Sequence, residues 1–149
     1  MGLKMFRASW ILLLIFSTIA ALGGATMIFY PQFFMANEIK NYVGQTWSSL
    51  EAANQKLFSY FLHDVRLLGF MQFTAALVMI VIVLIYYRKL DKPSWYICLG
   101  INTVALGSSI GLNITIGDIF VNIFLVSLML LGYIALALGA APILKRKPA

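Results

Sequence analysis

The chain has 149 residues, of which 62% are hydrophobic and only 11% are charged. This balance excludes an ordinary soluble domain, because a water-soluble surface needs about 25% charged residues. The formal net charge of +6 comes from basic residues at the ends of apolar segments, where they indicate membrane topology and not nucleic-acid binding.

Four apolar segments, each about 20 residues long, have the length that crosses a bilayer. They predict an all-α, four-transmembrane-helix bundle, with residues 1–149 forming a single membrane domain. The chain between them is too short for a separate water-soluble catalytic domain. With one cysteine, Cys98, and one histidine, His63, the chain has no disulfide pair and no bis-histidine haem ligation. We expect no metal and no cofactor.

The first predicted span covers about 9–30. It follows Lys4 and Arg7 and continues for about 22 residues, or about 33 Å of helix, until Pro31 stops it. A cleaved signal peptide is the alternative, because residues 23–25 are small enough for a cleavage site. The apolar core of a signal peptide has only about 7–15 residues, so the length favours a span.

Residues 31–66 form the one long connection, predicted to lie on the outer side of the membrane. Its apolar residues are Phe33, Phe34, Ile39, Tyr42 and Val43, which alternate with polar ones. This alternation predicts an amphipathic helix in the membrane interface, and Gly44 is expected to end it.

The second span is predicted at about 67–87. Residues 48–51, Ser-Ser-Leu-Glu, match a capping box and so predict a helix start. From there, apolar residues recur at helical spacing into the second apolar segment. We therefore expect one long second helix from about Ser49 to Arg88, with a bend at Gly69.

The third and fourth spans are predicted at about 94–116 and 119–141, with a turn at Gly117-Asp118 and an end at Pro142. An even number of crossings puts both termini on one side. That side carries eight basic residues, Lys4, Arg7, Arg88, Lys89, Lys92, Lys145, Arg146 and Lys147, and the other side carries three, Lys40, Lys56 and Arg66. The positive-inside rule then predicts cytoplasmic termini.

The third span carries two opposite stripes, each within about 40° at 100° per residue. Gly100, Gly107 and Gly111 form one stripe, and Asn102, Ser109 and Asn113 form the other. Glycines let another helix approach closely, and amides need partners that lipid does not offer. We expect one stripe to face its own bundle and the other a cavity, a second protomer or another subunit. The alternative is that both stripes pack within the bundle.

Polar residues of three spans are candidates for a pocket that opens to the outer side. The set is Gln72, Asn102, Ser109, Asn113, Asn122 and Tyr133. Asn113 and Asn122 are equally far from the turn between the last two spans, so they are expected to meet at one depth. The simpler interpretation is that these residues form hydrogen bonds between helices.

Charged residues gather where the second helix is expected to meet the outer surface. His63, Asp64 and Arg66 lie near the depth predicted for Asp118, and an Arg66–Asp118 ion pair would hold the second helix to the last hairpin. This outer-edge cluster would suit a lipid headgroup or a quinone ring, or it simply anchors the helix. The chain has no second histidine, no carboxylate pair within a span and no nucleophile elbow, so we predict no catalytic residue and no enzyme.

Aromatic residues at the cytoplasmic ends of the spans are predicted to form interface belts. They are Trp10, Tyr86, Tyr87, Trp95 and Tyr96. Cys98, at the same level, is expected to be an inert small residue.

Four short motifs are shared with a known group of proteins. They are Phe29-Tyr30-Pro31-Gln32-Phe33-Phe34, Arg66-Leu67-Leu68-Gly69, Ala75-Ala76 and Arg88-Lys89. On these motifs the chain resembles the DoxX-like group of small four-helix integral membrane proteins. The resemblance implies an association with membrane redox systems, such as quinone-linked sulfur oxidation.

The function expected from these features is that of a non-enzymatic accessory or assembly subunit of a larger membrane complex, of a redox or respiratory kind, which docks through the third helix. The alternative is a lipid- or quinone-binding protein that uses the outward-facing polar pocket. The expected partners are membrane lipids and either a protein subunit or further copies of the chain. No nucleic acid is expected.

Overall fold

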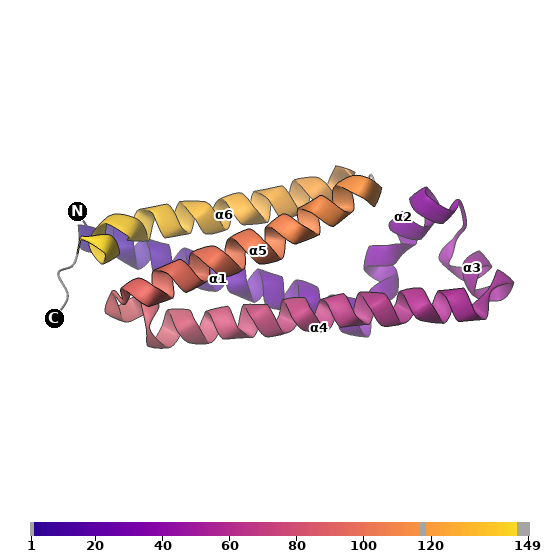
Figure 1. The fold of residues 1–149 in the computed structure, drawn as a ribbon, viewed down its shortest axis with the longest axis horizontal. Coiled ribbons are helices and arrows are strands. Elements are labelled where there is room, and N and C mark those ends of the chain that lie inside the picture. Colours follow the sequence, from indigo (N-terminus) through magenta and orange to yellow (C-terminus); the bar gives the residue numbers. More distant parts are fainter. Residues whose placement is uncertain (1, 117–118, 146–149) are drawn as a thin grey trace.

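A computed structural model describes residues 2–116 and 119–145. Its regular structure within these ranges is entirely helical, which confirms the all-α prediction. The elements are α1 (Gly2–Phe29), α2 (Pro31–Val43), α3 (Trp47–Ala53), α4 (Gln55–Ile85), the 3-10 helix η1 (Tyr87–Lys89), α5 (Lys92–Ile116) and α6 (Ile119–Leu144). The four long helices run side by side, and α2 and α3 pack on the first part of α4 (Figure 1).

The long helices follow an order in space that differs from their order in the chain. α1 packs against both α4 and α6, and α5 packs mainly on α6. The start of α1, the end of α4, the start of α5 and the end of α6 lie at one end of the bundle, here called the η1 end (Figure 1). α5 and α6 therefore form an antiparallel hairpin that rests on α1.

Three helical stretches are long and apolar enough to cross a membrane: Lys4–Phe29, Gln55–Lys89 and Asn122–Leu144. They support the prediction of a multi-pass membrane protein. α5 has 25 residues, about 37 Å at 1.5 Å per residue, but it is not among the three. Its amides, hydroxyls and glycines make it the most polar of the long helices, so apolarity alone identifies three of the four predicted spans.

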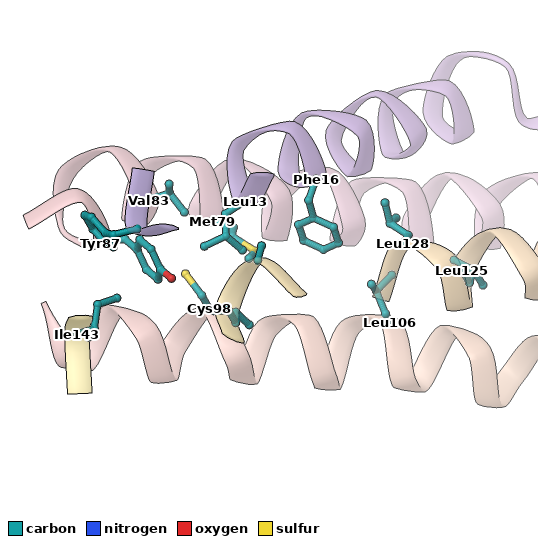
Figure 2. Close-up of a cluster of buried hydrophobic side chains, with 13 residues drawn as sticks. Leu13, Phe16, Met79, Val83, Tyr87, Cys98, Leu106, Leu125, Leu128 and Ile143 are labelled. Atoms are coloured by element: carbon teal, nitrogen blue, oxygen red, sulfur yellow. The ribbon is translucent and has the colours of Figure 1, made fainter. Parts of the chain in front are cut away.

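Buried apolar side chains join the four long helices in one core that begins at the η1 end (Figure 2). The labelled members are Leu13, Phe16, Met79, Val83, Tyr87, Cys98, Leu106, Leu125, Leu128 and Ile143. A separate small cluster of Ile39, Leu50 and Phe58 holds α2 and α3 on α4. The described chain thus has a bundle core, a second core under α2 and α3, and a small cluster of Ala20, Ala21 and Ala76 between α1 and α4.

The connection between α1 and α4 contains the predicted helix. α2 begins at Pro31 and ends at Gly44, whose φ of 71° is left-handed. Glycine adopts this conformation without steric cost, which makes it a common helix terminator. The buried side chain of Ile39 faces α3 and α4 within the small cluster.

The prediction of one helix from Ser49 to Arg88 is wrong, because the helix is broken at Asn54. Asn54 has φ −151° and ψ 84°, and its side-chain oxygen accepts a hydrogen bond from the Leu57 backbone N–H at 3.1 Å. Asparagine is a favoured N-cap for this reason. The long second helix is therefore α4, from Gln55 to Ile85, and it runs through Gly69 without interruption.

The capping box also lies two residues earlier than predicted. The Ser49 backbone N–H donates to Thr46 Oγ1 at 3.2 Å, and the Thr46 backbone N–H donates to Ser49 Oγ at 2.8 Å. Ser48 and Glu51, the predicted pair, are both exposed. Serine takes the place of the usual glutamate because its short side chain reaches back over the same three-residue separation.

The last helix extends past Pro142, where an end was predicted. Ile143 is completely buried in the bundle core, so packing holds the final turn in place although proline lacks an N–H to donate. At the other side of the η1 end, α5 begins with a cap in which the Ser94 backbone N–H donates to Asp91 Oδ2 at 2.8 Å.

Candidate functional site

Asn102, the first residue of the amide stripe of α5, faces α6. Asn102 is fully buried, and its Nδ2 donates to the Met129 carbonyl at 3.3 Å. Its Oδ1 has no hydrogen-bond partner and lies against Gly132, where a Cβ would collide with it. Gly132 is thus the residue on α6 that makes room for the Asn102 side chain.

Further polar contacts fasten α5 to α6. The Tyr133 hydroxyl lies 2.9 Å from Thr103 Oγ1, which donates to the Leu99 carbonyl, so the tyrosine is the donor of this pair. Trp95 Nε1 donates to the Leu136 carbonyl at 3.0 Å. Tyr133 and Asn102, two residues of the predicted pocket, therefore lie at one helix interface.

The other members of the predicted pocket are divided among several places. Gln72 lies at the α1–α4 interface, where its Nε2 donates to the Ala20 carbonyl at 3.1 Å. Ser109 donates to the Ala105 carbonyl of its own helix at 2.8 Å. Asn122 is half-buried on α6, and the side chain of Asn113 lies outside the described residues. The structure does not bring Gln72 together with Asn102 and Tyr133.

The outer-edge charge cluster is only partly described. His63, Asp64 and Arg66 are exposed on α4. Asp118 lies outside the described residues, so its ion pair with Arg66 stays a prediction.

The glycine stripe of α5 lies on the surface of the described bundle. Gly100, Gly107 and Gly111 are exposed, and a Cβ added at any of them would have no atom within 4 Å. Val104, which lies between them, is 70% exposed. Ser108 is exposed too, and its hydroxyl donates to the Val104 carbonyl at 2.6 Å. We call these five residues the glycine face.

The other helical glycines with described surroundings all make close contacts within the chain. At Gly24, an added Cβ would lie 2.7 Å from the Phe73 backbone nitrogen and 2.9 Å from the Gly69 carbonyl oxygen. Gly69 approaches Gly24 reciprocally, and Gly23, Gly132 and Gly139 meet polar side chains. Small residues are selected in such helices because they let neighbours approach. The glycine face is the exception, since nothing in the described chain uses its smallness.

A buried polar contact at the η1 end was not predicted from the sequence. Ser9 Oγ donates to the Ala135 carbonyl at 2.6 Å and lies 2.7 Å from the Tyr87 hydroxyl, which is therefore the donor to Ser9. A Cβ at Gly139 would collide with this hydroxyl. Tyr87 is fully buried, so its prediction as an interface-belt residue is wrong, whereas Tyr86 and Tyr96 are exposed.

The serine, tyrosine and glycine of this contact come from three different helices. In the sequence, only the small residues Ala135 and Gly139, one helical turn apart, indicated this contact. They predict that another helix approaches closely, but not which residues it contributes. Cys98 is buried beside Tyr87 in the same core (Figure 2), as expected for an inert small residue.

We predict that Asn102→Leu leaves the stability of the chain unchanged or raises it slightly. The substitution removes a buried oxygen without a partner together with one long hydrogen bond, worth about 0.6 kcal/mol in membrane proteins. Leucine has a similar size and no polar group to bury. Thermal unfolding in detergent measures the effect, with Asn102→Ala as the control that leaves a cavity and is expected to lower the midpoint. A clear loss of stability in the leucine variant would mean that Oδ1 has a partner.

The chain matches no protein-family model, and comparison with curated proteins and with solved structures finds no match either. The resemblance to the DoxX-like group therefore stays a prediction. Any functional proposal must be argued from the geometry of the chain itself.

Proposed function

We propose that this protein is a non-enzymatic subunit of a larger membrane complex and that it docks on a transmembrane helix of another polypeptide through the glycine face of α5. The observation that carries the proposal is the contrast among the helical glycines. A Cβ added at Gly23, Gly24, Gly69, Gly132 or Gly139 would meet other parts of the chain closely, whereas one added at Gly100, Gly107 or Gly111 would meet no described atom within 4 Å.

The docking requires α5 to cross the membrane. The directions in which α4 and α6 run support such a crossing. α4 ends and α6 ends at the same end of the bundle (Figure 1), and both belong to stretches long and apolar enough to cross. The chain between them must return across the same thickness, and α5 is the helix that does so. We therefore propose four crossings with both termini on one side, cytoplasmic by the positive-inside rule.

A glycine face directed at lipid gains nothing from its lack of side chains. Each glycine in a helix interior costs about 1 kcal/mol relative to alanine, whatever lies beside the helix. Against another helix the same residues allow close backbone approach and good van der Waals packing, which drive helix association in membranes. Ser108 already donates within its own helix, so a partner helix need not supply an acceptor for it.

Three of the polar residues expected to line a pocket make hydrogen bonds between helices. Gln72 joins α4 to α1, and Asn102 and Tyr133 join α5 to α6. Such hydrogen bonds stabilise bundles modestly. We therefore favour docking over lipid or quinone binding as the function.

The test is native mass spectrometry of the protein extracted from its own membrane in a mild detergent. We expect one other polypeptide at fixed stoichiometry. In the double variant Gly107→Leu and Gly111→Leu we expect the monomer alone, because two isobutyl groups would hold the partner helix away. The folded chain should tolerate them, since no described atom lies within 4 Å of a Cβ built at either position.

The matched control is Val78→Leu with Val81→Leu, which adds bulk at two exposed positions of α4 and should keep the partner. The proposal fails if the wild-type chain is a monomer or only a homo-oligomer. It also fails if the glycine variant retains the partner at wild-type stoichiometry.

A further inference from the structure

The η1 end of the bundle carries a strong excess of positive charge. The basic residues described there are Lys4, Arg7, Arg88, Lys89, Lys92 and Lys145, from α1, η1 and its flanks, the start of α5 and the end of α6. Figure 1 places these helix ends together. Segments far apart in the sequence therefore contribute to one surface.

Little negative charge opposes this surface. Asp91 is the acidic residue in the chain around η1, and one of its oxygens already accepts the Ser94 backbone N–H at 2.8 Å in the cap of α5. The other acids with described positions, Glu51 and Asp64, lie on α3 and α4 toward the opposite end. Among the described residues, six basic side chains and one carboxylate lie at the η1 end, so its net charge there is positive.

Aromatic residues lie among the basic residues of the η1 end. The Arg88 guanidinium lies over the Trp10 ring, 4.6 Å from its centroid, a cation–π contact that holds the charge in place. Tyr86 and Tyr96 are exposed at the same end. Tryptophan and tyrosine gather at the headgroup level of bilayers, so we expect the cationic side chains at the level of the lipid phosphates.

The helix surfaces next to the charges are apolar and exposed. Met5, Ile11, Ile85 and Ile97 are exposed near the basic residues of α1, η1 and α5. A ligand that fits both features has an anionic group attached to hydrocarbon chains. Basic residues at the cytoplasmic edge of transmembrane helices attract anionic lipid headgroups in this way.

We propose that the η1 end binds anionic phospholipid, with the phosphate held by the basic side chains and the acyl chains along the exposed flanks of α1, α4 and α5. This binding is separate from the glycine face. Failure of one proposal leaves the other standing, because the lipid test needs no partner subunit.

Trp10 and Trp95 serve as reporters of bound lipid at this end. The full-length chain with Trp47→Phe, which removes the tryptophan of the opposite end, is reconstituted into phosphatidylcholine vesicles. Brominated phosphatidylglycerol or brominated phosphatidylcholine is then added at equal mole fraction, and quenching of tryptophan fluorescence is compared. We expect quenching by the anionic lipid to indicate a several-fold higher affinity, which falls as salt is added.

Two triple variants with the same net charge give the control. Lys4→Gln, Arg7→Gln and Lys145→Gln neutralise three of the six described basic residues, and we expect them to abolish most of the preference. Lys40→Gln, Lys56→Gln and Arg66→Gln remove as many charges elsewhere and should keep it. Equal quenching by both lipids in the wild-type background would overturn the proposal, and so would an unchanged preference in the first variant or insensitivity to salt.

Discussion

Replacing Gly139 with alanine is expected to destabilise the bundle by about 1–3 kcal/mol, the cost of overpacking a tight core. The new Cβ would occupy the place of the Tyr87 hydroxyl. Tyr87 has no free direction in which to move, because it is fully buried and stacks on Phe6 at 5.8 Å between ring centroids. The Ser9–Tyr87 hydrogen bond should therefore be lost together with the packing around it. Thermal or denaturant unfolding in detergent measures the change.

Two further variants separate this effect from a general effect of alanine. Gly100→Ala makes the same chemical change where no atom lies within 4 Å, and we expect no loss of stability. Tyr87→Phe combined with Gly139→Ala removes one of the two colliding oxygens and leaves Ser9 Oγ, so part of the stability should return as a favourable coupling between the two sites. Wild-type stability in Gly139→Ala would contradict the described contact.

Replacing Gly24 with alanine is expected to have an effect of similar size at the opposite part of α1. The added Cβ would lie 2.7 Å from the Phe73 backbone nitrogen and 2.9 Å from the Gly69 carbonyl oxygen. Backbone atoms cannot rotate away, so α1 and α4 must separate along their crossing. The expected loss is about 1–3 kcal/mol, measured by the same unfolding experiment.

Its neighbour Gly23 is the matched control. A Cβ there would meet only the end of the Gln72 side chain, at 3.1 Å, and that side chain is flexible. Gly23→Ala should therefore cost clearly less than Gly24→Ala. Equal losses in both variants would mean that α1 and α4 do not cross at Gly24 and Gly69.

Hydrophobic segments and turn residues predict most of the helical architecture. The apolar segments identify the long helices, Gly44 ends α2 as expected, and Pro31 marks the start of that helix. The errors lie at boundaries where two local signals compete. Thr46 and Ser48 are both suitable helix N-caps. The helix starts at Thr46 because this start buries Leu50 in the cluster with Ile39 and Phe58.

Packing also overrides local preference at the two remaining boundaries. The end of α6 depends on Ile143, whose burial in the bundle core outweighs the unfavourable effect of Pro142. The break at Asn54 depends on a side-chain cap with Leu57, which competes with the regular apolar spacing on both sides. Neither outcome follows from periodicity alone.

In the candidate site, too, periodicity predicts one part of the arrangement and packing decides the other. Periodicity places the glycines and the amides on opposite sides of α5, but it does not fix the rotation of that helix in the bundle. Gly132 favours the observed rotation, since it provides space for Asn102 on α6. With Asn102 turned inward, the glycine face on the opposite side of α5 is exposed within the described chain.

Photo-crosslinking in the native membrane tests the docking role of the glycine face most directly. A photoreactive residue is placed at Val104, within the glycine face, or at Val81, on the exposed side of α4. We expect position 104 to form one discrete adduct with another polypeptide, position 81 to form none, and the adduct to disappear when Gly107 and Gly111 are leucine. Adducts with lipid alone at position 104, or the same protein adduct from both positions, would contradict the account.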